Sequence, residues 1–261
     1  MLQGSGSCGA GHEGTIGGRG CPSHALWRWG RRAGNQAQQP RWCNREGSVT
    51  AGHFGLAAGV KAYAPKTPLW ALMVATYLLD FAFILCVGAG LERFAPITPE
   101  HPAYGQVTIQ ALYTHSLLGA VALAGFAMLA TRGAWGRRAP WVIGSVVLSH
   151  WFLDLVVHRP DLPFVPANAA GLPLLGLGLW RVPIAAMLTE LALCISGTLL
   201  YARARLHTVP SPATGRSVAA PVVTGLLLMS LLAADFFAAP MPVTVLLMLL
   251  LIVLCGWLDA Q

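Results

Sequence analysis

Charged residues are scarce in this chain of 261 residues: they make up 10% of the sequence, whereas apolar residues make up 55%. A soluble domain normally carries about a quarter charged residues, so the composition argues against a water-soluble globule and favours a membrane protein. The net charge of +7 does not indicate a nucleic-acid partner. The basic residues cluster between apolar runs, as they do in the cytoplasmic loops of membrane proteins.

Paired cysteines and the motifs of soluble hydrolases are also missing. The six cysteines form no Cys-x-x-Cys pair, and three of them lie inside apolar runs, which argues against a disulfide framework and against a zinc ribbon. We expect the thiols to be reduced or inert. No Gly-x-Ser-x-Gly element lies between a strand and a helix, so nothing indicates a lipase-type nucleophile.

The first part of the chain differs from the rest. Residues 1–48 contain eleven Gly and six Arg but no apolar period, so nothing in them can form a core. We expect a disordered tail, and we interpret it as translated upstream sequence, with the biological start near Val49. An Arg-rich, acid-poor transit peptide is the alternative.

Six apolar runs follow, each close to the roughly 20 residues that an α-helix needs to cross a bilayer. They are Leu69–Leu91, Thr108–Ala130, Pro140–Val157, Val182–Tyr201, Val218–Ala238 and Val243–Leu258. The sequence therefore predicts an all-α polytopic membrane protein with six transmembrane helices, in a single domain over residues 49–258. A short helix, His53–Tyr63, precedes them. It either folds back on the first run about the Pro65–Pro68 turn or lies on the membrane surface.

Basic residues alternate between the two sides of these runs. Arginines are concentrated between the second and third runs and between the fourth and fifth, and two lysines precede the first run. By the positive-inside rule, both termini and the even-numbered loops are then cytoplasmic. Arg159 and Arg181, after the third run, are the exceptions to this pattern.

Several ionisable residues interrupt the apolar runs, although each costs roughly 2.5–3.5 kcal/mol near the middle of a bilayer on insertion scales. At a rise of about 1.5 Å per residue, His115, His150 and Glu190 share one depth, about 12 Å below the outer boundary. Asp80 is slightly deeper and Asp154 slightly shallower. Because four separate runs place polar groups at one level, we predict a single buried site that opens towards the outer face.

The third run carries His150, Asp154 and His158 at i, i+4 and i+8, which places them on one helix stripe. Imidazole and carboxylate groups in this mixture suit Zn²⁺, with Mn²⁺ or Fe²⁺ as alternatives. Such an ion activates water for hydrolysis. Buried His and Asp also serve as interhelical hydrogen-bond partners or as proton relays in transporters. For the combined set with His115 we favour a functional site, whereas Glu190 is equally explained by pairing with Arg or His.

A stiff, proline-rich segment follows His158 directly. It contains three prolines in seven residues and then a glycine-rich stretch, residues 171–180. We interpret it as a lid or rim above the site, with Arg159 available to pair with an anionic head group. A simple outer loop with an Arg159–Asp161 ion pair is the alternative.

At these residues the sequence resembles a family of bacterial inner-membrane proteins catalogued as membrane-bound metal-dependent hydrolases. The resemblance covers about residues 50–258 and depends on Gly52-His53-Phe54-Gly55, Ala64-Pro65-Lys66-Thr67, Leu79-Asp80, Thr114-His115-Ser116-Leu117, Ser149-His150-Trp151-Phe152-Leu153-Asp154 and His158-Arg159-Pro160-Asp161. It implies that the metal-site residues are His53, Asp80, His115, His150 and Asp154. Many members have a Pro-Asp-x-Asp cluster where this chain has a lone Asp80. This difference weakens the case for a second metal and leaves the number of ligands open.

Together these patterns predict an inner-membrane, metal-dependent hydrolase that acts on a lipid, a lipid-linked phosphate or another interfacial substrate. The expected metal ligands are Asp80, His115, His150 and Asp154. The expected catalytic residues are His53, as ligand or general base, and His158, and the expected substrate-binding residues are Arg159 and Glu190. One alternative is a small transporter or permease that uses the same residues as a proton or substrate relay. The other is a structural membrane protein.

Overall fold

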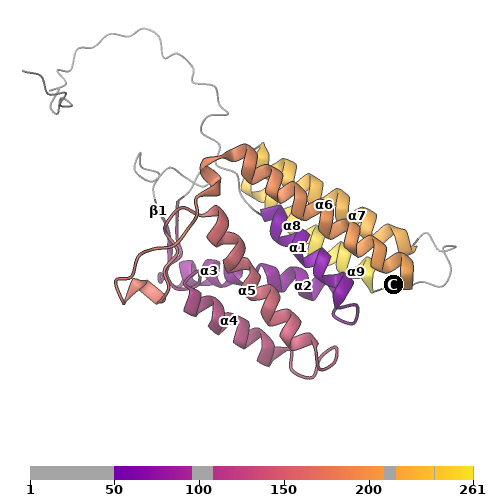
Figure 1. Ribbon diagram of the computed structural model, residues 1–261, viewed down its shortest axis with the longest axis horizontal. Helices are drawn as coiled ribbons and strands as arrows, with labels where there is room; N and C mark the ends of the chain where they lie inside the picture. Colours follow the sequence, from indigo (N-terminus) through magenta and orange to yellow (C-terminus); the bar gives the residue numbers. More distant parts are fainter. Residues whose placement is uncertain (1–49, 96–107, 209–215, 238, 261) are drawn as a thin grey trace, which may run out of the picture. The chain divides into compact units, whose positions relative to one another are not determined.

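Helices dominate the part of the chain that the computed structural model describes, which is residues 50–95, 108–208, 216–237 and 239–260 (Figure 1). The tail predicted for residues 1–48 lies outside these residues. The helices are α1 (Thr50–Tyr63), α2 (Leu69–Thr76), α3 (Leu78–Gly88), α4 (Leu117–Ala130), α5 (Ala139–Val157), α6 (Pro183–Thr208), α7 (Arg216–Phe236), α8 (Met241–Leu250) and α9 (Gly256–Asp259). A π-helical turn, Leu251–Cys255, joins α8 to α9. Two short strands, β1 (Arg93–Ala95) and β2 (Thr108–Gln110), pair antiparallel.

Four apolar helices are long enough to cross a membrane. They are Ala139–Val157, Pro183–His207, Val218–Phe236 and Met241–Asp259. They correspond to the third, fourth, fifth and sixth predicted runs, and their boundaries agree with the predicted ones within a few residues except at the longer C-terminal end of the fourth. These helices fit a multi-pass membrane protein, as the composition indicated.

The first two predicted runs do not form simple straight spans. The first is divided at Tyr77 into α2 and α3, which are bent by 52° relative to each other. The second contains a regular helix only from Leu117 onward, because the Ser116 side chain accepts a hydrogen bond from the Gly119 N–H and caps α4 there. Within the described residues the structure therefore has four full-length spans, or five if the bent pair is one span, and the predicted count of six is not confirmed.

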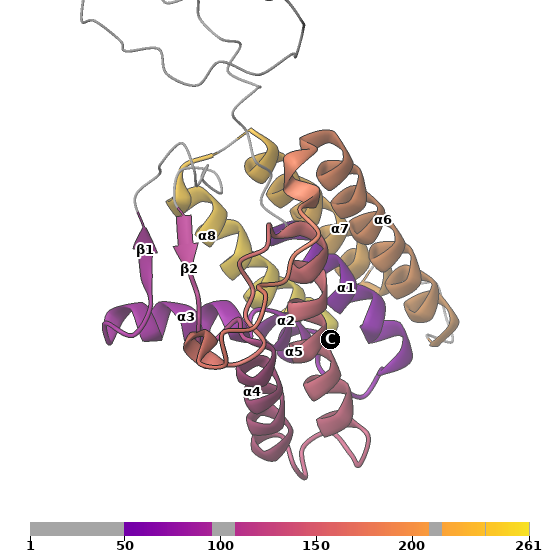
Figure 2. The ribbon, with the colours of Figure 1, turned by 60° about the vertical axis from the view of Figure 1, so that its left-hand side comes forward.

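Helix α1 is packed inside the helical bundle and does not lie along its surface. It lies along α6 and also contacts α2, α5 and α7 (Figures 1 and 2). Ala51, Phe54, Ala57 and Ala58 have no exposed surface. Of the two arrangements considered for this helix, folding back against the other helices is the one observed.

Small residues allow α1 and α6 to approach closely. A Cβ atom added to Gly55 of α1 would lie 2.8 Å from backbone atoms of Cys194 in α6. Gly197 of α6 lies against the Gly55 carbonyl in the same way. Helix pairs in membranes use such glycines because lipid supplies little hydrophobic drive for association, so backbone contact and van der Waals packing replace it.

A buried carboxylate, Asp259, links the last helix to the beginning of the bundle. It accepts hydrogen bonds from the Leu69 N–H (3.1 Å) and the Tyr201 hydroxyl (2.8 Å), and its Oδ2 lies 2.8 Å from the Lys61 Nζ. Lys61 lies in the last turn of α1 and Leu69 begins α2, so the Asp259 side chain fixes the turn between them. The α1–α2 hairpin is thereby held in one position relative to α6, which matters because α1 carries His53.

We predict that Gly55→Ala lowers the stability of the purified protein by about 1–3 kcal/mol, because the added methyl group must push α1 away from the α6 backbone. Gly125→Ala in α4 is the matched control, since a Cβ at that position meets nothing within 4 Å. Thermal unfolding in detergent, followed by tryptophan fluorescence, measures both. Equal stability of the two variants would contradict the close approach of α1 and α6.

Candidate metal centre

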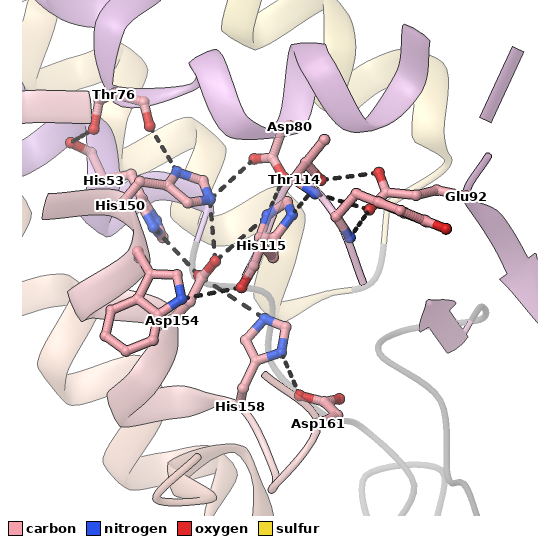
Figure 3. Close-up of polar contacts among 12 residues, drawn as sticks. His53, Thr76, Asp80, Glu92, Thr114, His115, His150, Asp154, His158 and Asp161 are labelled. Atoms are coloured by element: carbon pink, nitrogen blue, oxygen red, sulfur yellow. Dashed lines mark hydrogen bonds and ion pairs between the residues drawn. The ribbon is translucent and has the colours of Figure 1, made fainter. Parts of the chain in front are cut away.

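Six ionisable side chains meet in one place, and we call them the His/Asp cluster (Figure 3). Its members are His53 of α1, Asp80 of α3, His115 of the turn before α4, His150 and Asp154 of α5, and His158, which directly follows α5. The ring centroids of His115 and His150 are 5.4 Å apart, so the predicted convergence of groups from separate apolar runs is confirmed. The side chain of Asp80 is 34% exposed, whereas those of the other members are at most 10% exposed.

Asp154 is the central residue of the cluster. Its Oδ2 lies 3.1 Å from the His150 Nε2 and 3.6 Å from the His115 Nε2. Its Oδ1 lies 3.5 Å from the His53 Nε2 and 3.9 Å from the His158 Nε2. One carboxylate therefore contacts four imidazoles, two through each of its oxygens.

Asp80 contacts two of the same imidazoles from the other side. Its Oδ1 lies 3.3 Å from the His115 Nε2 and its Oδ2 lies 3.7 Å from the His150 Nε2. Two groups of three therefore have ligand atoms within 4.8 Å of one another and are suited to hold a metal ion. They are His53, His150 and Asp154, and Asp80, His115 and His150.

The bend at Tyr77 fixes the orientation of His150. Because α2 ends at Thr76, the Thr76 carbonyl is turned away from the helix ladder, and it lies 2.6 Å from the His150 Nδ1. A carbonyl oxygen can only accept, so the Nδ1 of His150 carries the proton. The Nε2 of His150 then faces the carboxylates with its lone pair when the ring is neutral.

His115 is oriented by a chain of two side chains. The Thr114 hydroxyl donates its single proton to the Glu92 Oε2 at 2.9 Å, and its oxygen lies 3.0 Å from the His115 Nδ1. The hydroxyl oxygen must therefore accept from the His115 Nδ1–H. The Glu92 Oε1 also accepts from the N–H groups of Tyr113 and Thr114, at 2.7 and 3.0 Å.

His158 leaves the helix but stays in contact with the cluster. It is the C-cap of α5 and has extended backbone angles, and its Nδ1 lies 3.0 Å from the Asp161 Oδ1. Burial lowers the pKa of the His158 imidazole, but the charge of Asp154 and the hydrogen bond to Asp161 raise it by more, so the pKa lies above its ordinary value. The surrounding carboxylates thus favour positive charge at this position.

Three imidazoles share one arrangement. His115, His150 and His158 each direct Nδ1 to an acceptor outside the cluster and Nε2 to a carboxylate inside it. A neutral ring in this tautomer presents its lone pair to the lone pairs of a carboxylate, which repel unless a positive charge lies between them. That charge is either a second proton on each ring or a shared cation. Outer hydrogen bonds of this kind are typical of metal-binding histidines.

The distances inside the cluster suit a shared cation. Two ligands that bind one ion at about 2.1 Å with a tetrahedral angle lie about 3.4 Å apart. The six Nε2–oxygen distances range from 3.1 to 3.9 Å. Direct charged hydrogen bonds are shorter, about 2.7–2.9 Å. Imidazole nitrogen and carboxylate oxygen also form a donor set that Zn²⁺, Mn²⁺ and Fe²⁺ accept.

Sequence reasoning missed four residues that support the cluster. They are Thr76, Glu92, Thr114 and Trp151, whose indole Nε1 donates to the His115 carbonyl at 3.0 Å. Glu92 follows an apolar run and reads as a solvated loop acid, yet it is 4% exposed. Its contact with Thr114 joins residues 22 positions apart, so a short stretch of sequence cannot predict this contact. Trp151 is buried beside His115.

The predicted substrate-binding residues lie apart from the centre of the cluster. Glu190 is buried in α6, with its carboxylate near the backbone of Ala51 and Gly52 at the beginning of α1. It therefore lies beside the first turn of α1, which carries His53. Arg159 begins the segment after α5 and is partly exposed. Its role and that of Glu190 in substrate binding stay predictions.

The proline-rich segment is bonded to both helices that flank the cluster. Leu117 and Leu118 at the beginning of α4 donate to the carbonyls of Pro163 and Phe164, at 3.0 and 3.1 Å. Gly178 donates to the His158 carbonyl at 2.6 Å. The segment is therefore attached beside the cluster, and Asp161 within it contacts His158.

We predict that Thr114→Val weakens the binding of a divalent ion by about 10–100-fold, because the His115 ring loses the acceptor that fixes its tautomer. Thr114→Ser keeps the hydroxyl and should bind like the unmodified protein. Thr224→Val is the matched control, a buried threonine of α7 whose hydroxyl donates to the Ala220 carbonyl of its own helix. Titration calorimetry with Zn²⁺ measures all three, and equal affinities for Thr114→Val and the control would refute the role of the Glu92–Thr114 chain.

Comparisons with protein-family models, with curated proteins and with solved structures find no match to this chain. The resemblance to the hydrolase family therefore stays a prediction, and the function has to be inferred from the His/Asp cluster itself.

Proposed function

We propose that this chain is a multi-pass, metal-dependent hydrolase of a bacterial inner membrane that acts on a lipid or another interfacial substrate. The observation that carries the proposal is the common orientation of His115, His150 and His158, whose Nε2 atoms face the carboxylates of the cluster. Proteins seldom place ionisable groups inside apolar helices without a use for them, because the cost of burial is several kcal/mol per charge. Here the arrangement has the form of a ligand set with its outer hydrogen bonds in place.

Asp80, His115, His150 and Asp154 would hold the ion. A divalent ion at this position supplies Lewis acidity and a source of activated water at neutral pH. His53 and His158 both contact the Asp154 Oδ1, at 3.5 and 3.9 Å, so each is close enough to serve as a ligand or to exchange a proton with a reacting group.

The surroundings of Asp80 support a lipid substrate. Asp80 is the most exposed member of the cluster, and the large residues beside it in α3 are apolar: Phe81 is 37% exposed and Ile84 is 54% exposed. Ile84 lies one helical turn from Asp80 and so shares its face of the helix. A substrate that reaches Asp80 along this surface needs an apolar part for the surface and a polar part for the cluster. Arg159 would pair with an anionic head group, and Glu190 is the second predicted substrate contact.

The proposed topology keeps six membrane crossings with both termini in the cytoplasm. The bent α2–α3 pair would supply one crossing, and α4, which has 14 residues, would supply a short one. The positions of the basic residues between the runs support this orientation.

We predict that the protein purifies with bound divalent metal and that His150→Ala loses the ion that His150 ligates, because His150 lies in both groups of ligands. His207→Ala is the control, a substitution of an exposed histidine at the end of α6. Metal analysis by mass spectrometry gives the ion content. Fluorogenic carboxyl-ester and phosphodiester lipids in mixed micelles report hydrolysis, which should require the metal and persist in His207→Ala.

A metal-free protein would contradict this proposal. If that protein also carried protons into vesicles, and His150→Ala abolished the transport, the cluster would be a proton relay of a transporter.

A further inference from the structure

We infer that the His/Asp cluster binds two divalent cations, with Asp154 bridging them. This inference rests on the proposed function, because it adds the number of ions to the same metal site. It differs from the expectation from sequence, in which the lone Asp80 weakened the case for a second metal. In the structure, two imidazoles occupy the side of Asp154 where that second ion would bind.

The first argument comes from the chemistry of the imidazole ring. A neutral imidazole has one lone pair, so each Nε2 can bind one ion. Both groups of three ligand atoms contain His150. Because His150 can bind one ion, the two groups cannot both be occupied at the same time. A two-ion assignment has to divide the four imidazoles between the ions and share a carboxylate, which can bind through both of its oxygens.

Asp154 divides the imidazoles in this way. Its Oδ1 faces His53 and His158, and its Oδ2 faces His115 and His150. Among the imidazoles of the described residues, Asp80 contacts His115 and His150, so it belongs to the second set. The first ion would then have His53, His158 and the Asp154 Oδ1 as ligands. The second would have His115, His150, Asp80 and the Asp154 Oδ2.

The rings of the two sets are direct neighbours. The ring centroids of His53 and His150, which belong to different sets, are 4.2 Å apart. Hydrolytic enzymes with two metal ions also use a carboxylate between the ions, and the pair stabilises both the attacking and the leaving oxygen of the substrate. The arrangement around Asp154 is of this type.

The charge of the surroundings agrees with two ions. Asp80 and Asp154 contact the imidazoles directly, Asp161 contacts His158, and Glu92 acts on His115 through Thr114. These four carboxylates carry four negative charges, and Arg159, next to His158, offsets one of them at most. A single divalent ion therefore leaves the site negative. A second ion makes it neutral or positive, which an anionic head group requires.

The test is the number of ions bound to the full-length protein in detergent. The protein is equilibrated with Mn²⁺, loosely held ion is removed by gel filtration, and bound manganese is counted by mass spectrometry. We expect about two ions per chain. Electron paramagnetic resonance should show the spectrum of two spin-coupled Mn²⁺ ions and not that of isolated ions.

Substitutions assign each ion to its set. His158→Ala and His53→Ala should each reduce the content to about one ion and remove the spin coupling, while the ion at His115 and His150 stays. Asp154→Asn should remove the coupling as well, because the bridge is lost. His207→Ala, in an exposed position at the end of α6, should keep both coupled ions. The count and spectrum of the unmodified protein decide the question even if a variant does not fold.

Three other results have distinct meanings. One ion per chain would overturn the two-ion inference and leave the proposed metal-dependent function standing. Two ions without spin coupling, both retained by His158→Ala, would place the second ion outside the cluster and would also overturn the inference. No bound ion would overturn the proposed function together with the inference.

Discussion

The contact between Asp154 and four imidazoles is the constraint on which the rest of this structure depends. Its two oxygens lie 3.1–3.9 Å from four Nε2 atoms, in a part of the chain that is otherwise apolar. The lone pairs of carboxylates and imidazoles at such distances repel each other unless positive charge lies between them. This repulsion is stronger in a low-dielectric interior than in water. Protons on the rings or bound cations can supply the positive charge. The outward hydrogen bonds of three Nδ1 atoms already satisfy one nitrogen of each ring, so the charge is needed beside Nε2.

Each irregularity of the helices around the cluster serves one of its members. The bend at Tyr77 turns the Thr76 carbonyl towards His150. The late start of α4 leaves His115 in a turn, where Glu92 satisfies the backbone of the two preceding residues. The end of α5 at Val157 allows His158 to contact both Asp154 and Asp161. Irregular backbone at membrane depth is tolerated where it is buried in protein and its polar groups are bonded, and these three places meet both conditions.

The sequence was sufficient for the apolar helices and for the convergence of the cluster, but not for the local backbone. Helix α5 was predicted as Pro140–Val157 and is Ala139–Val157, because a proline fits the first turn of a helix and Pro160 cannot continue one. The bend at Tyr77 has no Pro or Gly to mark it, so the first run was read as one helix. The second run was read as helical from Thr108, whereas Ser116 caps α4 and Glu92 holds the turn from 22 residues away. Contacts between residues so far apart in the sequence depend on the assembled fold, and a short stretch of sequence does not predict them.

The exposure of Asp80 connects metal binding with access to the site. Every other member of the cluster is at most 10% exposed in its side chain, so a substrate or an ion has to approach past Asp80. The two oxygens of Asp80 already contact His115 and His150. An arriving polar group therefore meets a ligand of the cluster directly and has to displace it or bind beside it. Because an exposed carboxylate is easier to displace than a buried one, Asp80 is the member whose contacts can change during substrate binding, whereas Asp154 has to stay in place.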